Sequence, residues 1–192
     1  MKTILKDTSK LTFMGVMLAL TILFVVATVI PNLAISIAVV IFLPTILTGI
    51  VLGPVSGGFI GFCAGLATLL RALLLPMSPF DVFFINPLVS ILPRIFIGIV
   101  AYYSFILVQK VIHNNIISSS IAGGVGMITN TFLVVGMLYI VFGQTMVDAM
   151  EGMAFLSALG FLFTTNGVIE MITAIIIVPV VYGAYLRYSK MR

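Results

Sequence analysis

Charged side chains are scarce in this sequence: 7% of its 192 residues are Asp, Glu, Lys or Arg, against roughly 25% in soluble domains. Together with 62% hydrophobic residues and a mean hydropathy of +1.35, this scarcity excludes a water-soluble fold. The short alternating segments of a transmembrane β-barrel are also missing. We therefore predict an all-α integral membrane protein.

Motifs for catalysis or energy coupling are absent as well. There is no G-x-x-x-x-G-K-[ST] sequence, so the chain cannot hold ATP through a P-loop. There is no H-E-x-x-H, paired-cysteine or G-x-S-x-G motif, and the single histidine, His113, is expected in a loop. The single cysteine, Cys63, cannot form an internal disulfide. We expect neither an enzyme nor a metal or cofactor bound by this chain, and the net charge of +4 suggests no nucleic-acid partner.

Long apolar segments, separated by proline, glycine and asparagine, are what the sequence has in abundance. A helix needs about 20 apolar residues to cross a bilayer. We predict one membrane domain over residues 1–192 with six transmembrane helices, at 10–30, 34–52, 55–75, 86–112, 118–142 and 160–186. With six spans, the basic residues of the two termini and of the loop after 112 share one side. The positive-inside rule makes that side cytoplasmic, and with it both termini.

Two charged residues, Arg94 and Glu170, are expected deep in the membrane, where each costs about 2.5 to 3.5 kcal/mol on insertion scales. At 1.5 Å per residue, Arg94 lies about 12 Å and Glu170 about 15 Å from the outer ends of their helices. Similar depths make them candidate partners. A structural ion pair and direct contact with a ligand both remain open.

Other polar residues are expected near these two charges. The candidates at similar depth, on three helices, are Asn86, Ser90, Arg94, Asn130, Asn166 and Glu170. Spacings of four residues place several of them on shared helix faces. A single buried asparagine often only bonds a neighbouring helix, but so many polar groups favour a hydrophilic pocket that opens outward.

Arg71, near the outer end of its helix, has two interpretations. It could extend its charged end to the interface, or it could form the rim of the pocket with Asp81. In the second case Phe80, Phe83 and Phe84 would close over a ligand; otherwise they anchor the chain at the interface.

Small residues recur at four-residue spacing on two helices. Gly57, Gly61 and Gly65 form one such face, for which packing within the chain is a sufficient explanation. Gly15 and Ala19 form a shorter one on the first helix, which another protein could use.

Five stretches carry a resemblance to a known family: LTFMGVMLALTILF, IVLGPVSGGFIGFCAGL, FFINPLVSILPRIFIGIVAY, GMITNTFLVV and NGVIEMITAIIIVPVVYG. Together they resemble the substrate-binding S component of energy-coupling factor (ECF) vitamin transporters, over nearly the whole chain. The resemblance implies a six-helix protein of the prokaryotic plasma membrane that binds a vitamin from outside. It also implies a transmembrane coupling subunit and two ATPases, which use the ATP, as partners. The family docks through an alanine-x-x-x-alanine motif, which Gly15 and Ala19 match here with glycine in the first position.

Within that family, NPLVSILPR, TNT and NGVIE look most like the pantothenate branch. An arginine in the pocket suits a carboxylate, and the absence of tryptophan favours a small ligand; folate and riboflavin stay open. The expected substrate-binding residues are Arg71, Asn86, Ser90, Arg94, Asn130, Asn166 and Glu170. Two other classes are a self-sufficient proton-coupled carrier that titrates Glu170 and an intramembrane enzyme that uses Glu170 beside Arg94. For the enzyme, no nucleophile or metal site is evident.

Overall fold

The computed structural model describes residues 8–29, 34–76, 79–149, 160 and 167–190, and over these residues it contains helices and no strand. The predicted all-α class is confirmed for this part of the chain. The helices are α1 (Thr8–Ala27), α2 (Ala34–Leu52), α3 (Pro54–Leu74), the 3-10 helix η1 (Pro79–Ile85), α4 (Pro87–Ser90), α5 (Leu92–Ile112), α6 (Asn115–Ala149) and α8 (Val168–Lys190).

Five spans are long and apolar enough to cross a membrane when α4 and α5 are counted together: α1, α3, α4–α5, α6 and α8. The described apolar part of α2, Val40–Leu52, is shorter. The chain is thus a membrane protein by length and composition of its helices. The sixth span, which α2 would supply, stays a prediction.

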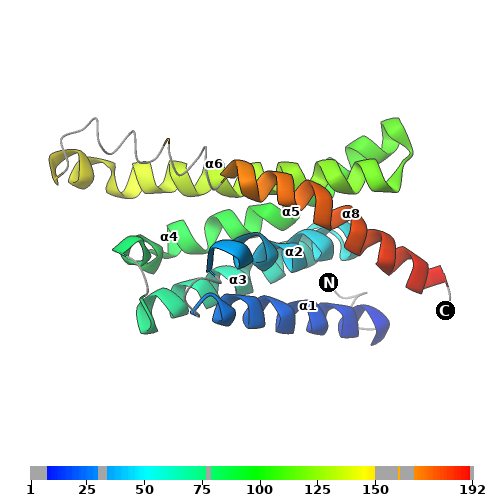
Figure 1. The fold of residues 1–192 in the computed structure, drawn as a ribbon, viewed down its shortest axis with the longest axis horizontal. Helices are drawn as coiled ribbons and strands as arrows, with labels where there is room; N and C mark the ends of the chain where they lie inside the picture. The colour runs from blue at the N-terminus through cyan, green and yellow to red at the C-terminus, as the bar shows by residue number, and fades with distance from the viewer. Residues whose placement is uncertain (1–7, 30–33, 77–78, 150–159, 161–166, 191–192) are drawn as a thin grey trace.

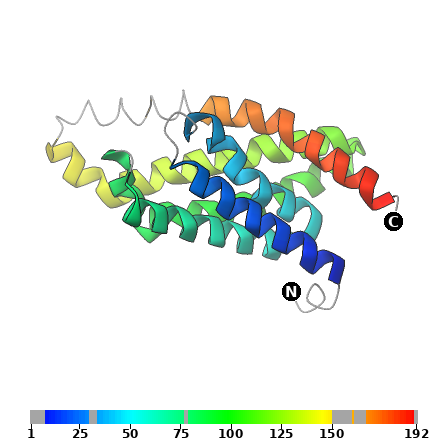
Figure 2. The ribbon, with the colours of Figure 1, turned by 60° about the horizontal axis from the view of Figure 1, so that its bottom comes forward.

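The helices form a bundle in which α2, α3 and α5 lie between α1 on one side and α6 with α8 on the other (Figure 1). The start of α1 and the end of α8 lie at the same end of the bundle as the α5–α6 turn, and η1 and α4 lie at the opposite end (Figures 1 and 2). This arrangement agrees with termini on a common side. Which side of the membrane that is stays a prediction.

Glycines allow α2, α3 and α5 to pack with their backbones in contact. A Cβ built on Gly57 would lie 2.6 Å from the Cα of Gly49, and one on Gly65 would lie 2.5 Å from the Cα of Ile91. A Cβ on Gly61 would collide with the carbonyl group of Arg94. The predicted use of the helix α3 glycines for packing within the chain is confirmed, and it brings α3 against the helix that carries Arg94.

The predicted single helix over 86–112 is divided in the structure. Helix α4 ends at Ser90, Ile91 joins the two pieces, and α5 starts at Leu92. Pro93 explains the division, because proline has no N–H to donate to the carbonyl of Val89 four residues earlier. Arg94 therefore lies in the first turn of α5, directly beside the point where the backbone hydrogen bonds of the helix are interrupted.

Candidate functional site

Arg94 is buried, with 5% of its surface exposed. Its Nη1 donates a hydrogen bond of 2.6 Å to the carbonyl oxygen of Val89. That oxygen is the acceptor that Pro93 leaves without a backbone donor. The local sequence thus turns the guanidinium of Arg94 toward the end of α4, where the Val89 carbonyl accepts its hydrogen bond.

Two aromatic rings flank the same guanidinium. Its Cζ lies 5.2 Å from the ring centroid of Phe84 and 5.8 Å from that of Phe42, within the range of a cation–π interaction. The Nε of Arg94 is buried and has no hydrogen-bond partner in the described part of the chain. A guanidinium has five N–H donors, so this one keeps donor capacity for an acceptor from outside the chain.

Three further buried polar atoms lack a partner among the described residues: the Oγ1 of Thr45, the Oγ of Ser56 and the Oδ1 of Asn130. Thr45 is fully buried, and Asn130 is 6% exposed. Unpaired buried polar groups are rare in native proteins and call for an explanation, such as a ligand or ordered water.

Glu170 lies in the first turn of α8 and is half-buried. No ion pair joins it to Arg94 in the described structure, although the two charges are near enough to attract each other. Cβ atoms built on Gly123 and Gly167 would contact Ala174 and Thr131, which makes α6 and α8 antiparallel. In this register Glu170 lies opposite residues 127–128 of α6, less than one turn farther from η1 than Asn130. Of the two interpretations that the sequence left open, the structural ion pair is thus not formed among the described residues.

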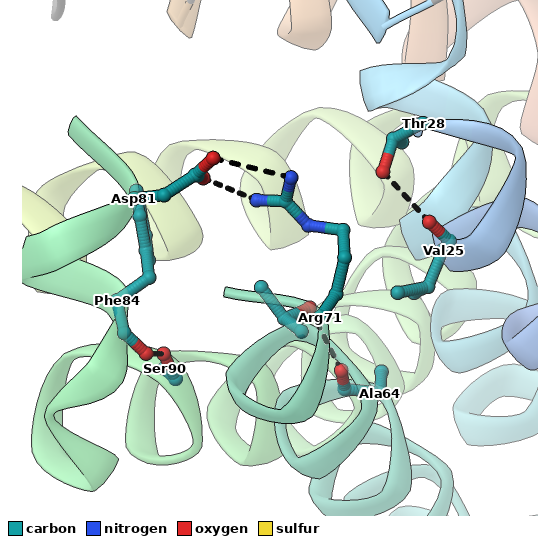
Figure 3. Close-up of polar contacts among 8 residues, drawn as sticks. Val25, Thr28, Ala64, Arg71, Asp81, Phe84 and Ser90 are labelled. Carbon is teal, nitrogen blue, oxygen red and sulfur yellow. Dashed lines mark hydrogen bonds and ion pairs between the residues drawn. The ribbon is translucent and has the colours of Figure 1, made fainter. Parts of the chain in front are cut away.

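Arg71 and Asp81 form an ion pair with two hydrogen bonds, one of 3.4 Å from Nη1 to Oδ2 and a shorter one from Nη2 to Oδ1 (Figure 3). The two side chains are 15% and 7% exposed. Arg71 is thus turned toward η1, and the pair ties η1 to the end of α3. Phe83 of η1 packs edge-on against Phe142 of α6, with centroids 5.1 Å apart. The segment η1 therefore spans from α3 to α6 at this end of the bundle.

The polar side chains next to η1 form hydrogen bonds with backbone groups. Asn86 caps α4, since its Oδ1 accepts a hydrogen bond of 2.9 Å from the amide of Leu88. Ser90 is fully buried, and its Oγ donates to the carbonyl oxygen of Phe84 (Figure 3). Roles for both in substrate binding stay predictions. Asn166 lies outside the described residues.

Gly15 and Ala19 are both exposed on α1. A Cβ built on Gly15 would meet no atom within 4 Å, and Leu11 and Val16 beside it are 43% and 51% exposed. Helix α1 packs mainly on α2 and α3, and its Phe13 ring also lies edge-on against Tyr185 of α8, with centroids 5.1 Å apart. The face that contains the small pair is therefore available to lipid or to a partner.

Phe42 and Thr45 were not predicted as site residues, because the second helix carries no charged side chain that would indicate a polar site. One signal was present: Phe42, Thr45 and Gly49 recur at spacings of three and four residues, which places them on one face of a helix. Nothing in the sequence, however, indicated that this face meets Arg94.

One comparison with known proteins gave a match. The model of the family "ECF transporter, substrate-specific component" matches residues 9–182, a range that includes Arg94, Asn130, Glu170 and the small pair on α1. The comparison with curated proteins gave no match.

Proposed function

This chain belongs to the family of ECF transporter substrate-specific components, and we propose that it binds a vitamin that carries a carboxylate, pantothenate being the leading candidate. The family consists of transporter components and is not a class of enzymes. Capture takes place from outside the cell membrane of a prokaryote, at the end of the bundle that holds η1 and α4.

The observation that carries this proposal is the state of Arg94. Its guanidinium is buried, is oriented by a hydrogen bond to Val89, and keeps an unpaired Nε. A carboxylate accepts two parallel hydrogen bonds from such a group. The rings of Phe84 and Phe42 lie against the same group, and an electrostatic contact with a buried group is stronger than one in water. Folate also carries carboxylates, whereas riboflavin has none.

The proposal extends to partners. The chain has no P-loop motif, which agrees with the dependence of uptake on two ATPases and a transmembrane coupling subunit that the family resemblance implies. The exposed face of α1 around Gly15 and Ala19 is the docking site for that subunit, because small residues let two helices approach closely in a bilayer. Residues Arg71, Asn86, Ser90 and Glu170 complete the surroundings of the ligand.

The test begins with the protein purified alone in detergent. Mass spectrometry of small molecules released on denaturation should detect a vitamin at a stoichiometric amount. Titration with pantothenate, folate and riboflavin should then give tight binding for pantothenate. Binding of pantothenol, in which an alcohol replaces the carboxylate, should be much weaker. Equal affinity for pantothenate and pantothenol would rule out carboxylate recognition. Vesicles that contain only this chain should not concentrate pantothenate; if they do, the protein is a self-sufficient carrier.

A further inference from the structure

We propose that α2 forms a wall of the ligand site, where the Thr45 hydroxyl and the Asn130 amide bind an uncharged polar group of the ligand whose carboxylate Arg94 holds. The inference rests on the proposed function and adds to it the chemical class of the ligand. That class is a small carboxylate with a hydroxyl or amide group close to the charge.

The position of Thr45 follows from two contacts of α2. A Cβ built on Gly49 would collide with the backbone of Gly98 on α5, and Phe42 lies against the guanidinium of Arg94. Thr45 lies between them on the same helix face. Both α2 and α5 are antiparallel to α3, so they are parallel to each other. Gly49 of α2 contacts Gly98 of α5. Four residues before each of them stand Thr45 and Arg94, which therefore lie opposite each other.

The hydroxyl of Thr45 behaves unlike those of other threonines in the bundle. A threonine inside a helix commonly bonds the carbonyl four residues earlier. Seven described threonines do so: Thr12, Thr21, Thr48, Thr68, Thr129, Thr131 and Thr173. Thr45 is fully buried and bonds nothing in the described structure. Its hydroxyl is therefore free to meet a partner from outside the chain.

Asn130 reaches the same region from α6. A Cβ built on Gly126 would lie 3.5 Å from Ile46 of α2 and 3.6 Å from Ala101 of α5, so this face of α6 is turned toward both helices. Asn130 follows one helical turn later on that face. Because α5 and α6 are antiparallel, Asn130 lies opposite Ile97, one turn from Arg94. Its side-chain Oδ1 is buried and has no hydrogen-bond partner in the described structure.

Three unpaired polar atoms thus come from three helices within about one turn of each other: the Nε of Arg94, the Oγ1 of Thr45 and the Oδ1 of Asn130. The first is cationic and needs an anion. The other two are neutral and can each donate or accept, because an amide can be turned either way. An apolar carboxylate such as a fatty acid would satisfy Arg94 and leave both neutral groups unpaired, so the site selects against it. Pantothenate, which carries an amide and two hydroxyl groups besides its carboxylate, fits the class.

The test uses Thr45→Val, with Thr48→Val as the matched control. Both threonines are fully buried on α2, but the Thr48 hydroxyl already bonds the carbonyl of Pro44 at 2.7 Å. With radiolabelled pantothenate as the probe, Thr45→Val and Asn130→Leu should each raise Kd about fivefold, the loss of one hydrogen bond. Thr48→Val should leave Kd unchanged.

Thermal melts of the ligand-free protein supply a second readout. Because the Thr45 hydroxyl has no partner to lose, Thr45→Val should melt no lower than wild type. A lower Tm would mean that this hydroxyl bonds within the protein and would overturn the inference. If wild type binds pantothenate and Thr45→Val binds it equally well, the inference alone fails. If wild type binds none of the vitamins tested, the proposed function fails and the inference fails with it.

Discussion

Replacing Arg94 by methionine separates a ligand contact from a structural role. Methionine fills a similar volume without charge. The change removes the hydrogen bond to the Val89 carbonyl and every bond from the guanidinium to a ligand. A hydrogen bond to a charged group contributes about 1.5–3 kcal/mol, and each 1.4 kcal/mol corresponds to about tenfold in affinity. We therefore expect Kd for pantothenate to rise at least about tenfold, and to about a hundredfold if two bonds are lost.

Arg94→Lys gives the intermediate case. The ammonium group keeps the charge but is a single point donor in place of the planar fork that grips both oxygens of a carboxylate. It can reach either the Val89 carbonyl or the ligand. We expect Kd to rise about tenfold, the loss of one of two charge-assisted bonds.

The assay is isothermal titration in detergent with two ligands, pantothenate and pantothenol, for wild type and both variants. If Arg94 holds the carboxylate, Arg94→Met weakens pantothenate binding and leaves the weak binding of pantothenol unchanged. The difference between the two losses should be at least about 1.4 kcal/mol. Equal losses for both ligands, together with a lower Tm, would refute the reasoning and make Arg94 a structural residue that only serves the Val89 carbonyl.

Three further predictions concern the scaffold. Gly61→Ala should destabilise the ligand-free protein by about 1–3 kcal/mol or more, because its Cβ would collide with the backbone of α5. The control Gly58→Ala should melt near wild type, because its Cβ would lie 3.4 Å from a flexible side chain. Equal Tm values for the two variants would contradict the close backbone contact. Gly15→Leu should leave pantothenate affinity unchanged, since no atom lies within 4 Å of its Cβ position. The same change should abolish co-purification with the coupling subunit. Intact assembly would show that this face is not the docking site. A double-mutant cycle of Arg71→Gln and Asp81→Asn should give a coupling energy of about 1 kcal/mol or more in thermal stability. The reason is that the pair is bidentate and mostly buried. Additive effects of the two changes would show that the pair does not tie η1 to α3.

Several properties followed from the sequence because they depend on local composition. Long runs without charge require a membrane, and the glycines at four-residue spacing on α3 require close helix packing, which the contacts of Gly57 and Gly65 confirm. Arg94 stood out as a candidate site residue because an arginine within a hydrocarbon segment is costly unless something binds it.

Other properties depended on contacts between segments far apart in the chain. Pro93 and Arg94 are adjacent in sequence. Only the folded break between α4 and α5 shows that Pro93 leaves the Val89 carbonyl without a backbone donor and that Arg94 donates to it. The sequence left open an ion pair between Arg94 and Glu170, and only the folded structure shows that no such pair forms among the described residues.

The sequence by itself therefore determined that this chain crosses a membrane, that helices pack closely at glycine, and that a buried arginine needs an acceptor. The tertiary structure alone decided which groups share the surroundings of that arginine. It placed Phe42 of α2 against Arg94 and packed α2 and α6 against the helix that carries Arg94. The physical reason is that hydrophobicity and helix period act along the chain, whereas the partners of a buried polar group are set by the rotation and register of neighbouring helices, which only their packing defines.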